Sequence, residues 1–381
     1  MINLILFGSF FVMLLLNIPI AVSLGMSSIF ALLFSSSPLT VVPTNVYSGM
    51  AKFLLLAIPF FVLSGNIMAK AGISSRLVAF ADDCVGHRRG GIAIVIPPSI
   101  AFVVYASITG VSVGDMFMGG WIPGIMMGLS LVIIIMIECR KKGIQASKAK
   151  SSWGQRWKSF REAFWGFLMP VIIIGGIYGG VFTPTEAAAV SVVYGLVVGV
   201  FIYREVKMKD MIDILVDSGK TTGGIMLIIG AATLFSYVCT VFGIAQAAQA
   251  LLLEISGNKY IFLLIVNVIF LIAGCFVDAN SAMYIFIPIM YPVATQLGID
   301  PVHFGVIATV NLAIGQVTPP VGVNLFVAIG VSEKLQGLRD KTKVTIVSMS
   351  KAVWPQIVAC IIALLLITYV PWFSTVLLFG K

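Results

Sequence analysis

A pair of adjacent prolines interrupts an apolar stretch near the C-terminal end of the chain, at Thr318-Pro319-Pro320. Each proline lacks a backbone N–H and disfavours the helical conformation in the residue before it. The carbonyls at such a break lose their helical partners, so they can coordinate a cation. A second pair, Pro97-Pro98-Ser99, repeats the pattern in the first half of the chain. The pattern favours an ion or substrate site at each break, and the alternative is a plain helix kink.

Asp278 is the carboxylate with the most apolar surroundings. It follows the apolar run from Ile261 to Phe276 and stands shortly before Asn280 and Ser281. An acid at membrane depth is costly, which favours a role in an ion pathway. Asn280 and Ser281 would add the neutral oxygen ligands that suit a hard cation. The alternative is that Asp278 caps the next helix, with Asn280 and Ser281 in the capping turn.

No catalytic pattern accompanies these candidates. The five cysteines are scattered without a C-x-x-C pair, the two histidines stand alone, and there is no HExxH motif or P-loop. We therefore expect no disulfide, no cofactor and no enzymatic activity, and an ATP-driven pump is disfavoured. Thr183 and Glu186 have the spacing of a capping box, which predicts a helix start there.

The elements that position these residues are predicted to be membrane-spanning helices. Hydrophobic residues make up 59% of the chain and charged residues 10%, and the mean hydropathy is +1.07. Soluble domains usually carry about 25% charged residues. Several apolar runs reach the roughly 20 residues that a bilayer-spanning helix needs. The sequence therefore predicts an all-α polytopic protein of a bacterial inner membrane, surrounded by lipid.

The basic residues give a net charge of +9 and lie between the apolar runs. This is the distribution of topogenic Lys and Arg in cytoplasmic loops, and it does not indicate a nucleic-acid partner. The largest cluster predicts a cytoplasmic interfacial connector, 140–163, between a first half, 1–139, and a second half, 164–381. The runs from Phe164 to Gly180 and from Ala187 to Phe201 predict a helical hairpin whose tip faces the periplasm.

The first apolar stretch, from Ile2 to Leu33, is predicted to be a retained membrane segment. It lacks the basic start of a cleaved signal peptide. Pro19 divides it into two parts, because a proline inside a helix removes a hydrogen bond and clashes with the preceding turn.

Two weak internal repeats relate the halves. Pro98 and Pro320 lie 222 positions apart, whereas Gly72 and Gly243 lie 171 positions apart. Paired halves with broken helices are typical of the inverted repeats of secondary transporters. The difference between the two spacings makes the first half shorter by about 51 residues, just before Pro97. Either the repeat is asymmetric by nature or the chain carries an internal deletion.

Five segments spread along the chain resemble the large (M) subunit of the tripartite ATP-independent periplasmic (TRAP) transporters. Each alone is a weak signal, and together they are specific. They are Leu55-Leu56-Ala57-Ile58-Pro59-Phe60-Phe61-Val62-Leu63-Ser64-Gly65, Val85-Gly86-His87-Arg88-Arg89-Gly90-Gly91, Ile96-Pro97-Pro98-Ser99, Phe182-Thr183-Pro184-Thr185-Glu186-Ala187-Ala188-Ala189 and Gly315-Gln316-Val317-Thr318-Pro319-Pro320-Val321-Gly322.

The resemblance implies a sodium-coupled elevator importer with a scaffold, a transport domain and two re-entrant hairpins. It also implies a small four-helix membrane (Q) subunit and a periplasmic substrate-binding protein (P) as partners. The implied substrate is a C4-dicarboxylate, keto acid, sugar acid or sialic acid. We expect substrate or ions to bind at Gly315, Gln316 and the two proline breaks, with sodium near Asp278, Gly315, Thr318 and Pro319.

The chain departs from the family pattern where the repeats predict it. Members of the family continue after the Gly90-Gly91 segment into a first hairpin rich in Gly and Ser, and about 50 of its residues are missing here. A smaller departure is Asn66, where relatives often have Glu. The alternative function is therefore a truncated subunit or scaffold that assembles with partners without moving substrate.

Overall fold

The computed structural model describes residues 2–16, 18–85, 99–141, 152–320, 322, 324–326, 328–329 and 345–378. Every regular element within these ranges is helical. Seven helical stretches among them are long and apolar enough to cross a membrane. The predicted all-α polytopic membrane fold is therefore confirmed.

The first half forms short helices followed by one long one. Pro19 separates α1 from α2, as the sequence predicts. Gly110, at φ 78°, ends α6 in the left-handed conformation that glycine adopts without a steric penalty. The elements are α1 (Ile2–Leu15), α2 (Ile20–Leu33), α3 (Val41–Met50), the 3₁₀ turn η1 (Phe53–Leu56), α4 (Ala57–Lys70), α5 (Ile73–Val85), α6 (Ile100–Thr109), α7 (Val113–Gly119) and α8 (Trp121–Lys141).

The second half contains the predicted helical hairpin and the second broken segment. The capping box is confirmed, since the Glu186 N–H donates to Thr183 Oγ1 (3.3 Å) and the Thr183 N–H to Glu186 Oε2 (2.8 Å). The elements are α9 (Trp153–Tyr178), α10 (Pro184–Leu196), the π-helical turn η2 (Val197–Ile202), α11 (Met208–Val241), α12 (Ile244–Ser256), α13 (Lys259–Phe276), α14 (Ala279–Gln296), α15 (Pro301–Gly315), α17 (Ile346–Tyr369), α18 (Trp372–Thr375) and η3 (Val376–Leu378).

The basic connector expected at 140–163 does not form one separate element. Helix α8 continues through Lys141, and α9 begins at Trp153 and runs without interruption into the apolar span. Residues 142–151 lie outside the described residues. Residues 153–163 of the expected connector therefore form the first turns of the membrane helix α9. The Trp and Phe residues of these turns continue the apolar face of that helix.

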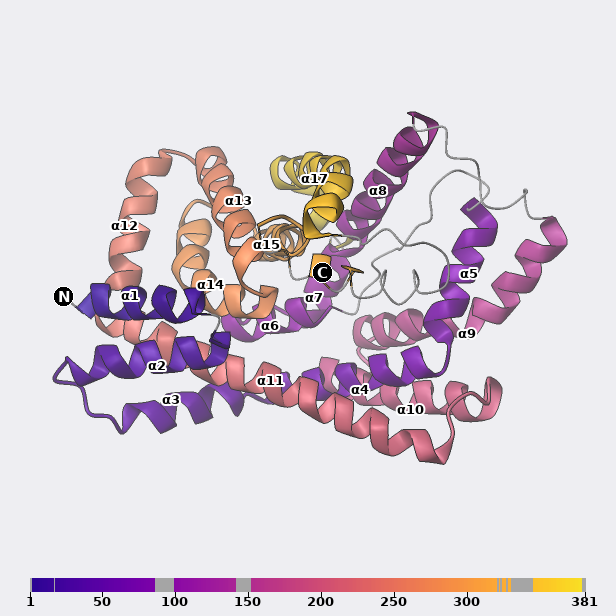
Figure 1. Ribbon diagram of the computed structural model, residues 1–381, viewed down its shortest axis with the longest axis horizontal. Coiled ribbons are helices and arrows are strands. Elements are labelled where there is room, and N and C mark those ends of the chain that lie inside the picture. The colour runs from indigo at the N-terminus through magenta and orange to yellow at the C-terminus, as the bar shows by residue number, and fades with distance from the viewer. Residues whose placement is uncertain are drawn as a thin grey trace.

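The helices pack as two groups that interleave along the sequence. In the first group, α11 packs against α2, α3 and α4, and α9 packs against α5 and α10. In the second group, α6, α7 and α8 from the first half pack with α13, α14, α15, α17 and α18 from the second half, and α11 of the first group also packs against α14. Figure 1 shows α1–α3 at one end of the molecule and α5 and α9 at the other, with α15, α17 and α7 between them. Both sequence halves therefore contribute to both groups.

Buried amides and hydroxyls join three helices of the second group. Asn311 of α15 donates from Nδ2 to Asn267 Oδ1 of α13 (2.8 Å), and Asn267 Nδ2 donates to Thr368 Oγ1 of α17 (3.1 Å). All three residues are buried. Lipid tails are as apolar as the helix surfaces, so burial of apolar surface does not drive membrane helices together. Interhelical hydrogen bonds, at about 0.6 kcal/mol each, therefore act together with van der Waals packing to hold the helices in contact.

Helices α13 and α15 also touch through glycines. A Cβ atom placed on Gly315 would lie 2.6 Å from Gly274 Cα, and one placed on Gly274 would lie 3.0 Å from Gly315 Cα. Small residues permit this close approach of two membrane helices. The contact fixes the end of α15, where its broken segment begins, against the end of α13.

Replacing Gly315 by alanine is expected to lower the free energy of unfolding by about 1–3 kcal/mol, because the new methyl group pushes α13 and α15 apart. Thermal or denaturant unfolding in detergent measures the effect. Gly8→Ala in α1 is the matched control, since its added Cβ meets no atom within 4 Å. The control should be as stable as the wild type or slightly more so, and equal behaviour of both variants would contradict the proposed packing.

Candidate functional site

Two helix interruptions far apart in sequence lie against each other. Helix α13 ends at Phe276 and α14 begins at Ala279, while α15 ends at Gly315. The backbone N–H of Gly322, after the proline pair, donates to the carbonyl of Cys275 near the end of α13 (3.2 Å). With the Gly274–Gly315 contact, this hydrogen bond holds the α13–α14 tip against the break that follows α15.

Asp278 caps α14. Its carboxylate accepts the backbone N–H of Asn280 (3.1 Å) and of Ser281 (3.2 Å), and it also accepts the Ser281 hydroxyl. This is the capping alternative from the sequence, and the contacts occupy both carboxylate oxygens. The Asn280 side-chain oxygen is buried and has no hydrogen-bond partner among the residues that the structure describes.

The Thr318-Pro319-Pro320 break keeps part of its polar backbone unpaired. The Thr318 N–H donates to the Gly315 carbonyl (2.9 Å) and the Thr318 hydroxyl to the Ile314 carbonyl (2.8 Å). The carbonyls of Thr318 and Pro319 accept no hydrogen bond from any other residue that the structure describes. Those two oxygens have the chemistry of cation ligands, whereas the Gly315 carbonyl already accepts a hydrogen bond.

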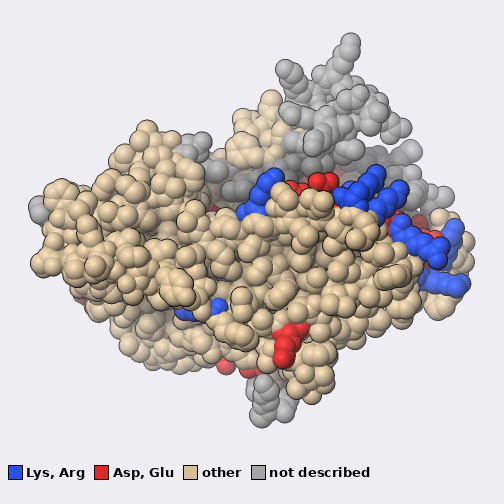
Figure 2. Space-filling model, turned by 90° about the horizontal axis from the view of Figure 1, so that it is seen from below, with Lys and Arg blue, Asp and Glu red and all other residues tan. Residues whose placement is uncertain are grey.

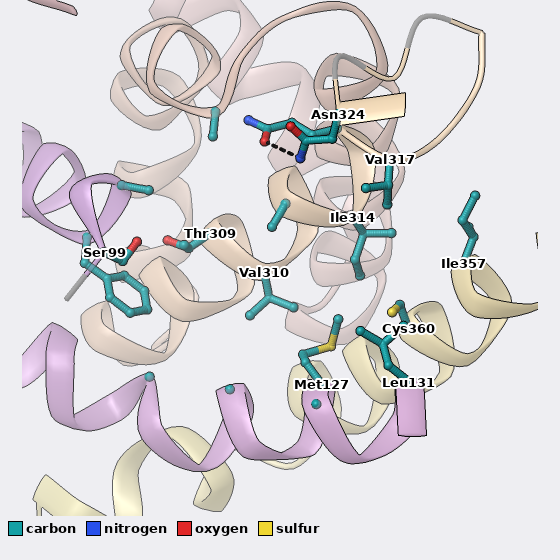
Figure 3. Close-up of a pocket in the computed structure, with 18 of the residues that line it drawn as sticks. Ser99, Met127, Leu131, Thr309, Val310, Ile314, Val317, Asn324, Ile357 and Cys360 are labelled. Carbon is teal, nitrogen blue, oxygen red and sulfur yellow. Dashed lines mark hydrogen bonds between the residues drawn. The ribbon is translucent and has the colours of Figure 1, made fainter. Parts of the chain in front are cut away.

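A cavity of about 760 Å³ opens beside these interruptions. Helices α6, α8, α14, α15 and α17 contribute to its walls, and most of the lining is apolar. In Figure 3 the hydroxyls of Ser99 and Thr309 turn toward one another, and the side chain of Asn324 is hydrogen-bonded to Gln316 (3.3 Å). The polar lining residues are Ser99, Asn280, Thr309, Gln316, Asn324 and Gln356.

Two helices begin at this cavity. Ser99 and Ile100 at the start of α6 line it, as do Ala279 and Asn280 at the start of α14. The first N–H groups of a helix lack intrahelical acceptors and carry the positive end of the helix dipole. The Ser99 side chain makes no capping hydrogen bond, so its hydroxyl adds a polar group at the same place. The Asp278 carboxylate already accepts the Asn280 and Ser281 N–H groups of α14, so the start of α6 is the helix end that favours an organic anion.

The structure brings together only part of the predicted site. Three predicted residues, Ser99, Asn280 and Gln316, line the cavity. Pro97 and Pro98 lie outside the described residues. The rest do not line the cavity; they are Asp278, Ser281, Gly315, Thr318, Pro319 and Pro320.

Sequence reasoning missed the contributions of α8 and α17. Gly120, Gly124 and Gly128 recur at four-residue spacing and present a smooth face to the cavity, and that spacing was a signal in the sequence. Gln356 of α17 also lines the cavity and donates from Nε2 to Glu138 Oε2 of α8 (2.8 Å). No local motif marks Gln356, because its partner is 218 residues away.

Asp278→Ala is expected to lower the free energy of unfolding by about 0.5–2 kcal/mol, since α14 loses its cap. Asp278→Asn should stay close to the wild type in stability, because asparagine caps helices about as well as aspartate. Unfolding of both variants in detergent measures the difference. If the asparagine variant is as unstable as the alanine variant, the charge of Asp278 rather than its capping geometry is what the fold requires.

The chain matches the sequence profile of the tripartite ATP-independent periplasmic transporter, DctM component, over residues 7–96 and 91–373. The two matches meet at 91–96, where the internal repeats place the shortening. The alignment with the C4-dicarboxylate TRAP transporter large permease protein DctM of Rhodobacter capsulatus spans 442 positions, more than the 381 residues of this chain. That relative therefore holds residues that have no counterpart here.

Curated relatives match over nearly the whole chain. The Rhodobacter capsulatus protein is 34% identical and covers 98% of each chain. The C4-dicarboxylate TRAP transporter large permease protein DctM of Pseudomonas aeruginosa is 37% identical over 93% of each chain. The sialic acid TRAP transporter large permease protein SiaM of Vibrio cholerae is 31% identical over 91% of each. The chain belongs to the DctM family of TRAP transporter large permeases, which are membrane transport proteins rather than enzymes.

Proposed function

We propose that the chain is the large membrane subunit of a sodium-coupled importer of small organic acids. The observation that carries the proposal is the cavity at which α6 and α14 both begin, beside the broken segment after α15. The N-terminus of α6 favours the carboxylate of a substrate, and the carbonyls of Thr318 and Pro319 favour a coupling cation. The apolar remainder of the wall suits the carbon skeleton of the acid.

The choice of substrate class follows the named relatives. Those relatives carry C4-dicarboxylates or sialic acid according to their names, and both compounds are carboxylates. A periplasmic binding protein that delivers the acid and a small membrane subunit are part of this proposal, as the TRAP assignment implies. We propose the bacterial inner membrane as the site of action.

Movement of one helical group past the other is the proposed transport step. The contacts between the groups include a hydrogen bond from Lys52 Nζ, before η1, to the Ser107 carbonyl of α6 (2.8 Å). A second is from the Tyr178 hydroxyl to Asp115 Oδ1 (3.4 Å). Single hydrogen bonds of this kind break and re-form readily, which suits a sliding boundary.

A truncated, non-transporting subunit is the second candidate function. The observation that favours it is the family match that divides at residues 91–96. In that case the chain would assemble with its partners and leave the substrate unmoved.

Uptake of labelled C4-dicarboxylate and sialic acid into proteoliposomes tests the two candidates. The vesicles contain the chain and its small subunit, with the binding protein outside and an inward sodium gradient present or absent. We expect uptake of one acid only with the gradient. Uptake that ignores the gradient would refute sodium coupling. Uptake only after the roughly 50 residues are restored between Gly91 and Pro97 would establish the truncated subunit.

Locking the two helical groups together is expected to stop uptake. Lys52→Cys with Ser107→Cys, joined by a short thiol-reactive cross-linker in a background without other cysteines, spans the boundary. The control pair, Asn66→Cys with Ser218→Cys, lies within the first group, where Asn66 Nδ2 donates to Ser218 Oγ (2.8 Å).

The experiment uses the version of the chain that shows uptake, either the chain as it stands or the one with the roughly 50 residues restored. The control cross-link should leave most of that uptake intact. Unchanged uptake with the 52–107 cross-link would exclude relative movement of the two groups.

A further inference from the structure

The first turns of α9 present aromatic and basic side chains together. Trp153 is 83% exposed and Trp157 is 68% exposed, four residues apart on the helix. Lys158 and Arg161 are also exposed on these turns. In Figure 2 most of the Lys and Arg atoms on the visible face gather toward the end of the molecule that holds α5 and α9, and the rest of that face is largely uncharged.

Packing against α5 holds this surface in place. The Trp157 ring stacks on Phe160 at 5.6 Å, and Phe160 in turn contacts Phe80 of α5 at the same centroid distance. The Ser159 hydroxyl, one residue before Phe160, donates to Asp83 of α5. Trp157 therefore stands on a half-buried aromatic cluster that joins α9 to α5.

Arg156 is half-buried on the same turns. Its guanidinium lies 5.8 Å from the Trp153 ring, and its Nε and Nη2 atoms are buried without a hydrogen-bond partner among the residues that the structure describes. From Ser152 to Phe164 the chain holds three basic residues and one acid, Glu162. The charge of Asp83 faces Ser159, so the surface around Arg156 and Lys158 is net positive.

We propose that this surface binds the phosphate headgroup of an anionic phospholipid. Tryptophan prefers the membrane–water interface, and α9 continues from these turns into an apolar span, which puts Trp153 and Trp157 at headgroup level. The exposed Lys158 and Arg161 then donate to the lipid phosphate, and each basic residue near an anionic surface strengthens binding. The proposal requires only that α9 spans the membrane and is independent of transport.

Lipid retention in nanodiscs tests the site. The wild-type chain is placed in phosphatidylethanolamine with increasing phosphatidylglycerol, and bound phosphatidylglycerol is counted by native mass spectrometry. Removing two charges, as Lys158→Gln with Arg161→Gln, should weaken binding by about 25-fold, or roughly fivefold for each charge. Inorganic phosphate added to pure phosphatidylethanolamine discs should not bind, because it lacks the acyl chains that fix a headgroup at the interface.

Two further variants keep the test decisive. Lys259→Gln removes an exposed charge that lies 5.2 Å from the ring of Tyr260 at the start of α13, and it should leave binding unchanged. Lys158→Arg with Arg161→Lys preserves both charges and should retain most of the binding, even if the glutamine pair fails to fold. Equal binding by the glutamine pair and the wild type, or an equal loss with Lys259→Gln, would overturn the proposal, and so would tight binding of inorganic phosphate alone.

Discussion

The architecture depends on one constraint, which is that backbone polar groups at membrane depth must be satisfied within the protein. Irregular backbone is tolerated there only where it packs on protein or lines a cavity. The interruption between α13 and α14 meets this condition through the Asp278 cap, which accepts the first free N–H groups of α14. The break after α15 meets it through the hydrogen bond from Gly322 to Cys275. The break after α15 thus donates a hydrogen bond to a carbonyl near the end of α13, and the two interruptions hold each other in place.

The same constraint concentrates polar chemistry in one place. The start of α6 lines one apolar cavity, and the carbonyls of the broken segment after α15 lie close to residues that line it. A helix N-terminus attracts an anion, while unpaired carbonyls attract a cation. A bound organic anion and a bound coupling cation would then each strengthen the binding of the other. The contact between Gly274 and Gly315 sets the distance between the ends of α13 and α15.

The second helical group is tied more firmly within itself than to the first. Asn267, Asn311 and Thr368 connect α13, α15 and α17 through buried side chains. Across the boundary, Lys52 reaches a backbone carbonyl from a partly exposed position. Buried networks hold a unique packing, whereas exposed single bonds exchange readily with water. Helix α11 also packs against α14 across the boundary, so any movement of one group past the other has to rearrange that packing as well.

The sequence by itself determined the membrane fold, the break at Pro19, the hairpin with its Thr183–Glu186 capping box and the family. These features depend on composition, on proline chemistry and on residues within one helical turn, all of which act locally. It also indicated Ser99, Asn280 and Gln316, because helix breaks are visible in the chain. Only the tertiary structure decided that Asp278 caps α14, that the α8 glycines and Gln356 line the cavity, and that the halves interleave. Those outcomes depend on contacts between residues up to hundreds of positions apart, such as Gln356 with Glu138, and no local pattern encodes such a pairing.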